Sequence, residues 1–444
     1  MEFMTGEKKR TDISVAELLS GRLDGEQVTM RGMVHIIRDM GVVSFLILRK
    51  AEGLVQCVCS EAVFQQNPCK EEAAIEVTGI VHQEQRAPGG YEIRLESIRI
   101  FSEPTEALPV PVNKWKMNTS LEAKLQYRTV SLRNPKERAK FRIQEGIVRG
   151  FRDYLHREGF TEIHTPKLVA KNAEGGANVF KLEYFHHPAA LAQSPQFYKQ
   201  MMVGVFDRVF EVAPVFRAEK HNTKRHLNEY TSMDFEMGYI DGYEDIMQME
   251  TGFLQYTMEL LKTEYAKELE MLQVELPDVS RIPSVPFAKA KELVAEKYNR
   301  QIRNPHDLEP EEEQLIGRYF KEEYGADFVF VTEYPSKKRP FYAMDDPKDP
   351  SVTLSFDLLF RGMEITTGGQ RIHEYPMLRE KMEKRGMTED GMDAYLRAFK
   401  DGMPPHGGLG IGLERLTMKL LGEDNVRETT LFPRDLSRLG PESG

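Results

Sequence analysis

Charged and apolar residues are mixed in one segment of the chain, FRAEKHNTKRHLNEYTSMDFEM, which runs from Phe216 to Met237. Arginine, lysine, histidine and carboxylic acids stand there beside Phe216, Leu227 and Phe235. A buried strand does not tolerate that much charge without partners, and a surface loop has no need of the large apolar residues. The charges therefore need partners, and the composition of the segment does not say what these are.

A glycine-rich segment near the C-terminal end, GGLGIGLERL (Gly407 to Leu416), is a candidate phosphate site. Its glycines run directly into a helical stretch, and Arg415 follows within the first turn. Backbone N–H groups at a helix N-terminus attract anions, and a guanidinium adds a permanent planar charge that suits phosphate. The alternative is a tight turn whose glycines allow a strand to pack closely against a helix.

The segment FDLLFRGMEITTGGQR contains two carboxylates, Asp357 and Glu364, seven positions apart. On one continuous strand they would point to opposite faces, because side chains alternate with a period of two. A hairpin turn at Arg361 and Gly362 would instead let them face each other, and opposed carboxylates suit Mg²⁺ that carries phosphate oxygens. The alternative is a pair of unrelated surface acids.

Two polar islands border apolar segments and are further candidates. One is QSPQFYK, from Gln193 to Lys199, and the other is Glu174-Gly175-Gly176. The loop from 173 to 177 has glycine hinges of the kind that let a loop close over a ligand. Each island is also compatible with an ordinary surface loop.

The composition limits the functions that these groups can serve. A chain of 444 residues predicts two or three domains, and a net charge of −10 argues against coating nucleic acid through bulk charge, although a local basic face stays compatible with it. Apolar runs stay below the ~18 residues of a membrane span, and the first ten residues are too polar for a signal segment.

Cys57, Cys59 and Cys69 cannot all pair in disulfides, which fits a reducing, cytoplasmic location. Cys57 and Cys59 alternate along an expected strand, so packing is favoured over zinc, which needs four ligands.

The elements that must position these groups fall into two regions. Residues 27–100 contain five β-rich runs with a short helical stretch after the third, which is the order of an OB-fold, although another small β-barrel fits the same pattern. Helices are expected further on over 137–158, 244–272 and 309–323, and closely spaced strands over 207–240 and 328–365. Such strands favour an antiparallel sheet flanked by helices, so an α+β protein is predicted rather than a parallel-sheet ATP-binding fold.

Several motifs in one order give the chain a family resemblance. GFTEIHTPKL is similar to motif 1 of the class II aminoacyl-tRNA synthetases, the segment from Phe216 is similar to motif 2, and GLGIGLERL is similar to motif 3. QSPQFYK, AEGG and GMPPHGG are forms typical of the aspartate group. From about Val28 to Pro441 the chain resembles the subclass b enzymes, and within them the aspartyl-tRNA synthetases of the archaeal and eukaryotic type. The resemblance implies an OB-fold anticodon-binding domain over 1–103, a linker over 104–130 and a class II catalytic domain over 131–444.

The resemblance implies that aspartate and ATP form aspartyl-adenylate and that the aspartyl group then passes to the 3′ end of tRNA. It implies three catalytic residues, which are Arg217, Glu364 and Arg415. It assigns aspartate binding to Glu174, Gln196, Lys199, Arg217, Asp234, Thr367 and Arg371. It assigns ATP binding to Arg217, Glu219, Arg225, His226, Leu227, Glu364, Gly412 and Arg415. Mg²⁺ is implied at Glu364 and at Thr367, where the family usually has serine, with Asp357 as a further carboxylate.

The resemblance also implies partners. The barrel would bind the anticodon of tRNA(Asp) through Arg38, Phe45 and Gln56, with Phe45 stacked on a base unless it fills the barrel core. At His35, and in the loop around Pro88, the chain lacks the tryptophan and the lysine of discriminating members, so it resembles the form that also charges tRNA(Asn). A cytoplasmic homodimer joined through motif 1, without membrane attachment, is implied as well.

Three rival interpretations share the catalytic fold. An asparaginyl-tRNA synthetase has no use for a cation at Lys199, and a tRNA-independent asparagine synthetase paralogue lacks the barrel. A catalytically silent RNA-binding relative does not need Arg217, Glu364 and Arg415 together. On the family resemblance, the segment that begins at Phe216 is strand, loop and strand, and a substrate is the partner of its charges.

Overall fold

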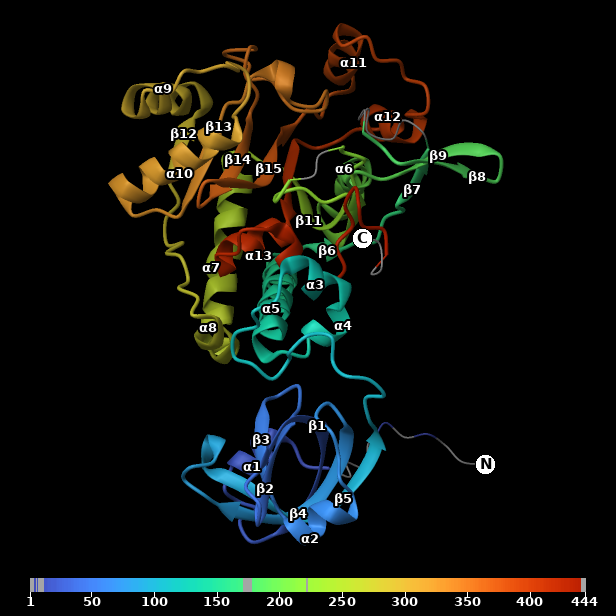
Figure 1. Cartoon of the computed structure of the whole chain (residues 1–444). Helices are drawn as coiled ribbons and strands as arrows, with labels where there is room; N and C mark the ends of the chain where they lie inside the picture. The colour runs from blue at the N-terminus through green and yellow to red at the C-terminus, as the bar shows by residue number, and fades with distance from the viewer. Residues whose placement is uncertain (1–3, 5, 7–11, 171–177, 221–222, 441–444) are drawn as a thin grey trace. The chain divides into compact units, whose positions relative to one another are not determined.

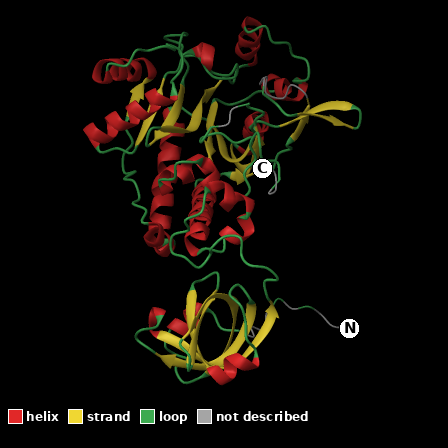
Figure 2. Ribbon diagram, in the orientation of Figure 1, coloured by secondary structure: helices red, strands yellow, loops and turns green. Residues whose placement is uncertain are grey.

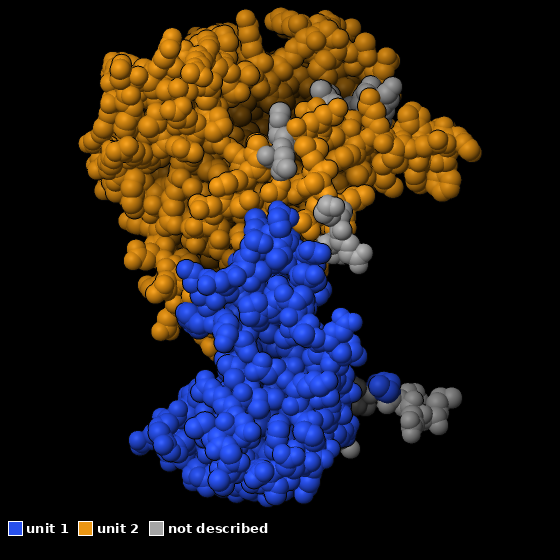
Figure 3. Space-filling view, viewed as in Figure 1, with its two compact units in different colours: residues 1–134 blue, residues 135–444 orange. Residues whose placement is uncertain are grey.

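The chain forms two compact units, Met1–Asn134 and Pro135–Gly444, which are coloured separately in Figure 3. The computed structural model describes residues 4, 6, 12–170, 178–220 and 223–440. Figure 2 shows that strands dominate the first unit, whereas the second combines sheet and helices. The segment 104–130, predicted as a linker, belongs to the first unit and contains the short helix α3 (Leu121–Gln126), which is followed by α4 (Arg128–Ser131).

The first unit is built around a closed barrel with the strand order β1-β2-β3-β5-β4 (Figure 1). Its elements are α1 (Val15–Leu19), β1 (Gln27–Asp39), β2 (Val43–Arg49), β3 (Leu54–Ser60), α2 (Glu61–Gln66), β4 (Ala74–Gln83) and β5 (Tyr91–Ser102). Because α2 follows the third strand, the predicted OB-fold order is confirmed. Cys57 and Cys59 both lie in the barrel core, as their spacing of two on a strand requires.

The second unit is organised by an eight-stranded sheet with the order β12-β13-β14-β15-β16-β11-β10-β6. In chain order these strands are β6 (Thr161–Glu162), β10 (Arg208–Phe216), β11 (Glu229–Gly238), β12 (Ser284–Pro286), β13 (Phe328–Thr332), β14 (Ser355–Phe360), β15 (Met363–Arg371) and β16 (His406–Gly412). All neighbours from β13 to β10 pair antiparallel, and only the two edge strands of this described sheet pair parallel. The predicted largely antiparallel sheet is therefore confirmed.

Helices cover one face of this sheet. They are α5 (Pro135–Arg157), α7 (Glu244–Glu264) and α13 (Leu413–Leu421), which lie together in Figure 1. Gly159, with φ of +80°, follows the end of α5 at the position where the sequence predicted the helix to stop. The predicted helix over 244–272 is interrupted at Tyr265, beyond which α8 (Ala266–Leu272) begins.

Smaller elements complete the second unit. They are β7 (Leu168–Ala170), β8 (Lys181–Tyr184), β9 (His187–Leu191), α6 (Gln196–Phe206), α9 (Phe287–Tyr298), α10 (Pro310–Tyr324), α11 (Tyr375–Lys384) and α12 (Asp393–Lys400). Strands β7, β9 and β8 form a separate small sheet, and α6, α11 and α12 share a second apolar cluster. Helix α10 matches the acidic helix predicted over 309–323.

The side chains of strand β11 alternate between two different environments, one on each face of the large sheet. Met233, Phe235 and Met237 belong to the apolar core shared with α5 and α7. The alternate residues point the other way, and Tyr230, Ser232 and Asp234 line a pocket. The mixture of charge and core that the sequence shows is thus a property of one strand with two different faces.

None of the helices in the described ranges has both the length and the apolarity that a membrane crossing requires.

Glu250 on α7 is fully buried beneath the sheet, where Thr366 donates a hydrogen bond to it (2.6 Å). Burial raises its pKa from 4.5 to about 8, against the effect of that hydrogen bond. In the unfolded chain the carboxyl ionises near pH 4.5, whereas in the folded chain it stays protonated. The contribution to stability is therefore fully present below pH 4.5 and is lost as the pH rises toward 8.

Replacing Glu250 by glutamine removes this loss, because the amide has the same shape and does not ionise. The melting temperature of Glu250→Gln, relative to the unchanged protein, is expected to rise between pH 5 and pH 8.5, by the equivalent of about 4 kcal/mol. Calorimetry at both pH values measures it, with the exposed Glu244→Gln on the same helix as the control. The same difference at both pH values would show that Glu250 is ionised in the folded state.

Candidate active site

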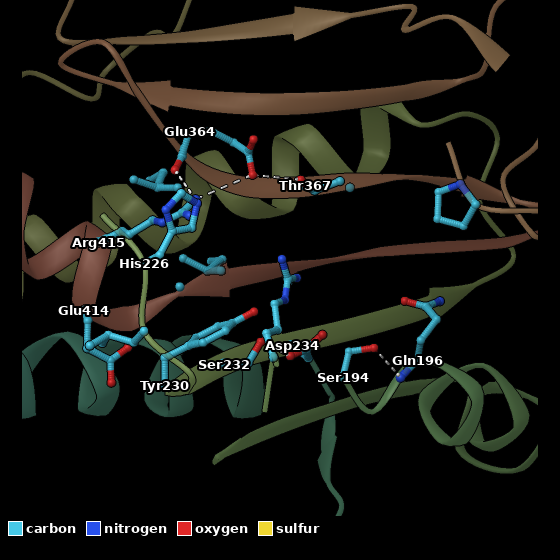
Figure 4. Close-up of a pocket in the computed structure, with 18 of the residues that line it drawn as sticks. Ser194, Gln196, His226, Tyr230, Ser232, Asp234, Glu364, Thr367, Glu414 and Arg415 are labelled. Atoms are coloured by element: carbon cyan, nitrogen blue, oxygen red, sulfur yellow. Dashed lines mark hydrogen bonds and ion pairs between the residues drawn. The ribbon is translucent and has the colours of Figure 1, made fainter. Parts of the chain in front are cut away.

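A cavity of about 270 Å³ opens on the face of the sheet that lies opposite α5 and α7. Figure 4 shows two ends: Glu364, Arg415 and His226 lie together at one end, Asp234, Ser194 and Gln196 at the other, and Thr367 between them. They are called here the Arg415 end and the Lys199 end. The pocket brings together most of the residues that the resemblance assigned to aspartate and ATP, from segments far apart in the chain.

At the Arg415 end, α13 begins directly after Gly412 and carries Arg415 into the pocket wall. Arg415 Nε donates to the carbonyl oxygen of Arg225 (3.2 Å), and its Nη1 donates to the carbonyl oxygen of Glu364 (3.2 Å). The Glu364 carboxylate accepts a hydrogen bond from Thr367 (3.4 Å) and lies 3.8 Å from Arg415. The predicted sequence of glycines, helix start and arginine is observed.

The loop between β10 and β11 is held together at its base by Asn228. The backbone N–H of Arg217 donates to the Asn228 carbonyl (2.9 Å), and the Asn228 amide donates to the carbonyls of Arg217 (2.7 Å) and Glu219 (3.0 Å). Arg217 and His226 each lie 3.9 Å from the Glu219 carboxylate. Leu227 anchors the returning chain in a small apolar cluster with α13. Residues 221–222 at the loop tip lie outside the described residues.

At the Lys199 end, four charged side chains are buried together. The Lys199 ammonium donates to Asp234 (3.0 Å) and to the carbonyl of Leu409 (2.8 Å), and it lies 3.3 Å from Glu236. Arg371 Nε donates to Glu236 (2.9 Å). Burial disfavours an ionised Glu236, but Arg371 and Lys199 outweigh it and hold its pKa below the ordinary value. We call these four residues, Lys199, Asp234, Glu236 and Arg371, the charge quartet.

The glycines of β16 make room for the charge quartet. Gly410 pairs with Asp234 and Gly408 with Glu236 in neighbouring strands. A Cβ at Gly410 would lie 2.9 Å from an Asp234 carboxylate oxygen, and one at Gly408 would lie 2.3 Å from a Glu236 carboxylate oxygen. Alanine is excluded at 408, because its Cβ would also lie 2.1 Å from the backbone carbonyl oxygen of Phe235. These two glycines pack closely against strand β11 rather than against a helix, and the phosphate site at the start of α13 stays a prediction.

A neutral hydrogen-bond chain supports the Lys199 end from below. Gln196 and Tyr395 both donate to the side-chain oxygen Oε1 of Gln200 (3.0 and 3.1 Å), and Nε2 of Gln200 lies 3.0 Å from His406 Nε2. His406 Nδ1 faces the carbonyl oxygen of Pro404 (2.8 Å), which can only accept, so Nδ1 carries the proton and Nε2 accepts. Burial lowers the pKa of His406 to about 4, which keeps this ring neutral at pH 7.

The two carboxylates of the predicted metal pair have different surroundings. The hairpin turn at Arg361 and Gly362 is observed, with φ of +46° and +73°, and Asp357 lies opposite Thr367 across it. Asp357 is buried, accepts from Arg339 (2.8 Å), and burial raises its pKa to about 6 despite that partner. The alternative of two surface acids is therefore wrong for Asp357.

The oxygens at the Arg415 end fit Mg²⁺ only as part of a larger ligand set. In the described part of the chain, no three His, Cys, Asp or Glu side chains are grouped so that they could hold a metal ion. The Glu364 carboxylate and the Thr367 hydroxyl are hard oxygen donors 3.4 Å apart. Mg²⁺ commonly uses one or two protein oxygens together with substrate phosphates and water, so this pair fits an ion that is shared with a phosphate ligand.

The barrel of the first unit presents a second set of predicted residues on its outer surface. Strand alternation puts Ser44, Leu46 and Leu48 inside, so that the half-buried Phe45 faces outward, opposite Arg38. The alternative that Phe45 fills the barrel core is therefore wrong. Gln56 lies on the neighbouring strand and donates to Glu92 (2.9 Å).

The two positions linked to tRNA discrimination differ in exposure. His35 is 4% exposed, and its Nδ1 lies 3.0 Å from Arg49, which pairs with Glu72. Pro88 is exposed at the start of a short turn between β4 and β5. His35 is thus built into the barrel, whereas Pro88 is open to a partner.

One residue that the sequence predicted for the site cannot be placed, and three residues found at the site were not assigned to it from the sequence. Glu174, on the predicted closing loop, lies outside the described residues. The sequence predicted that β11 presents Asp234 or Glu236 opposite its packing face but gave Glu236 no binding role, and the structure puts both on that face. Arg339 and Glu313 carry no spacing signal, because their partners come from distant segments.

Comparison with known proteins identifies the family. A family model described as tRNA synthetases class II (D, K and N) matches residues 120–436, and one for the OB-fold nucleic acid binding domain matches residues 28–101. The chain belongs to the class II aminoacyl-tRNA synthetases. The predicted fold class and the resemblance at the level of the family are thereby confirmed.

Relatives of this synthetase match it over nearly their whole length. It is 49% identical over 424 residues to the Aspartate--tRNA(Asp/Asn) ligase of Deinococcus radiodurans, with 94% of this chain and 96% of that protein covered. It is 40% identical over 432 residues to the Aspartate--tRNA(Asp) ligase of Pyrococcus horikoshii, with 95% and 98% covered.

Solved structures are similar across the whole synthetase. The asparaginyl-tRNA synthetase from Pyrococcus horikoshii complexed with asparaginyl-adenylate matches with a TM-score of 0.89 at 31% identity, with 96% of this chain and 99% of that chain covered. A putative aspartyl-tRNA synthetase from Leishmania major Friedlin matches with a TM-score of 0.87 at 31% identity, covering 99% and 97%. Overall fold alone therefore does not separate aspartyl from asparaginyl enzymes.

Proposed function

We propose that this synthetase is an aspartate–tRNA ligase, which activates L-aspartate with ATP and transfers the aspartyl group to tRNA. The observation that carries the proposal is a single pocket with two kinds of cation. Arg225 and Arg415 stand at one end, and the buried Lys199 and Arg371 stand at the other. The names of the relatives at 49% and 40% identity support the same amino acid.

The first step joins two anions, so positioning and charge neutralisation are the main tasks of the protein. An oxygen of the aspartate α-carboxylate attacks the α-phosphorus of ATP, forms the mixed anhydride and expels pyrophosphate. Arg217 is proposed to bridge the α-carboxylate and the α-phosphate, because a guanidinium offers two parallel donors to each oxygen pair. No side chain of this protein needs to act as a nucleophile.

The Arg415 end is proposed to hold the nucleotide. Glu219, His226 and Leu227 would contact the adenosine half, and Arg225 and Arg415 the distal phosphates. Mg²⁺, when bound, neutralises phosphate charge, and Glu364 and Thr367 are the residues proposed to hold it. Asp357 already pairs with Arg339, and its proposed part is to fix the strand on which Thr367 lies.

The Lys199 end is proposed to hold aspartate. Gln196 and Asp234, with Glu174 from the loop outside the described residues, would take the α-ammonium group. Lys199 and Arg371 would take the side-chain carboxylate. Both cations already have protein partners, so the substrate joins an existing network rather than filling an uncompensated positive pocket.

We also propose a homodimer joined through motif 1 and a cytoplasmic location, where tRNA is charged for translation. Two exposed aromatic side chains are compatible with such an interface. Phe206 is 46% exposed and Tyr239 is 72% exposed, and they flank the backbone hydrogen bond from Gly238 to Asp207 (2.8 Å).

Lys199→Leu is expected to raise the KM for aspartate and leave the KM for ATP nearly unchanged. Loss of the cation leaves Asp234 and Glu236 to repel a dicarboxylate substrate, which costs about 2–5 kcal/mol for a desolvated pair. ATP–pyrophosphate exchange measures both constants. Lys140→Leu is the control, since it also removes a buried lysine with carboxylate partners, but outside the pocket. An equal rise in both KM values would contradict the assignment.

Phe45→Ala is expected to weaken tRNA aminoacylation and to spare adenylate formation. Stacking of an aromatic ring on an unpaired base is worth about 1–3 kcal/mol, so the KM for tRNA is expected to rise severalfold or more. Phe101→Ala, at another partly exposed aromatic of the barrel, is the control. A parallel fall in pyrophosphate exchange would mean that Phe45 supports folding instead of tRNA binding.

The synthetase is expected to charge both tRNA(Asp) and tRNA(Asn) with aspartate. The residues at His35 and around Pro88 support this, as does the name of the Deinococcus radiodurans relative at 49% identity. Charging assays with each purified tRNA and labelled aspartate measure it. Failure to form Asp-tRNA(Asn) at high enzyme concentration contradicts dual use, and exchange that depends on asparagine instead of aspartate supports the asparaginyl enzyme.

A further inference from the structure

Four residues from four different segments close a ring of hydrogen bonds at the Arg415 end. Arg225 donates to Glu313 (2.8 Å), and the backbone N–H of Glu364 also donates to Glu313 (3.0 Å). The Glu364 carbonyl accepts from Arg415 (3.2 Å), and Arg415 in turn donates to the Arg225 carbonyl (3.2 Å). Three members of this ring already have proposed roles toward ATP, and the fourth, Glu313, has none.

Glu313 accepts two of the four hydrogen bonds that make up this ring. Both of its carboxylate oxygens lie within 3.0 Å of Arg225 Nη2, and one of them also receives the Glu364 N–H. Its side chain is 7% exposed and that of Arg225 is 16% exposed, so water competes little with the pair. A charge-assisted bond in such surroundings fixes direction as well as distance.

Close packing holds the helix that carries Glu313 against the strands of the site. A Cβ at Gly317 would lie 2.4 Å from the backbone nitrogen of Gly362, and one at Gly362 would lie 2.8 Å from the Cα of Gln314. Helix α10 therefore touches the β14–β15 turn, backbone to backbone. This contact brings Glu313 to the start of β15, where Glu364 lies.

The guanidinium of Arg225 keeps a buried donor without an acceptor in the described part of the chain. Its Nη2 is bound by Glu313, whereas its Nε is buried and has no hydrogen-bond acceptor among the described residues. A buried guanidinium nitrogen without an acceptor is costly unless a ligand supplies one. Glu313 thus orients a guanidinium that lines the pocket and whose hydrogen bonds within the described protein are incomplete.

We propose that Glu313 is a positioning residue for ATP: it fixes the Arg225 guanidinium and the Glu364 backbone in the arrangement that receives the distal phosphates. This inference rests on the proposed function, because it takes the Arg415 end as the nucleotide site. Glu313 itself touches no substrate in this proposal and acts through Arg225 and Glu364.

The neighbouring glutamates supply a matched control. Glu312 pairs with the buried Lys291 and caps α10, so its removal would disturb the helix itself. Glu311 is 61% exposed and pairs with Arg300 (3.1 Å) at the outer side of the same helix turn. Glu311→Gln therefore makes the same chemical change two residues from Glu313, without contact to the ring.

Glu313→Gln is expected to raise the KM for ATP by about 10- to 100-fold, the loss that corresponds to one hydrogen bond to a charged group. The KM for aspartate is expected to change less than twofold, and Glu311→Gln to behave as the unchanged enzyme. Glu313→Asp keeps the charge and is expected to recover part of the loss. Aspartate-dependent ATP–pyrophosphate exchange measures all four proteins, with melting temperatures to verify folding.

A double variant tests whether Glu313 acts through Arg225. If it does, Arg225→Gln combined with Glu313→Gln is little worse for ATP than Arg225→Gln alone. Additive losses, or equal rises in the KM for ATP and for aspartate, overturn the proposal. Should Glu313→Gln not fold, Glu313→Asp carries the same comparison. Absence of exchange in the unchanged enzyme contradicts the proposed function instead.

Discussion

The pocket depends on burying two cations and two carboxylates on one face of a sheet. Isolated buried charge is very costly, and removing one partner of a buried pair leaves the other uncompensated. The charge quartet meets this constraint because Lys199 contacts both carboxylates and Arg371 contacts Glu236. Strand β16 then has to present glycine at 408 and 410, where any larger side chain would occupy the space of the carboxylates.

The apolar side of the same strands supplies the rigidity that this arrangement needs. Phe235 lies between Asp234 and Glu236 in the sequence, but its side chain is fully buried on the opposite face of the sheet. Its ring packs edge-on against Phe160, with 5.5 Å between the ring centroids. Leu409 and Ile411 alternate with the glycines of β16 and join the same core. Along β11 and β16, core residues such as Met233 and Leu409 thus alternate with pocket residues such as Asp234 and Gly410.

Much of this fold follows from sequence pattern, because its elements repeat local rules. The five barrel strands, the hairpin at Arg361 and Gly362, and the helix start before Arg415 are all signalled by alternation or by glycine. The burial of Lys199 and the pairing of Asp357 with Arg339 are not signalled, because they depend on which distant segments meet. Glu313 is the clearest case: a run of glutamates predicts a solvated helix face, yet three neighbours in that run face three different environments.

The structure also changes the argument for choosing aspartate. From sequence, Lys199 and Arg371 look like two cations that asparagine would leave without a counter-charge, but Asp234 and Glu236 already balance them. The direction of the hydrogen bonds is then the property that distinguishes aspartate from asparagine. Lysine and arginine can only donate, and an asparagine amide would bring its own N–H groups against them. Asparagine keeps one acceptor oxygen but has an NH2 group in place of the other, so one of the buried donors would lose its hydrogen bond. Selection of a carboxylate over an amide then requires no excess of positive charge, only the fixed donors that the charge quartet holds in place.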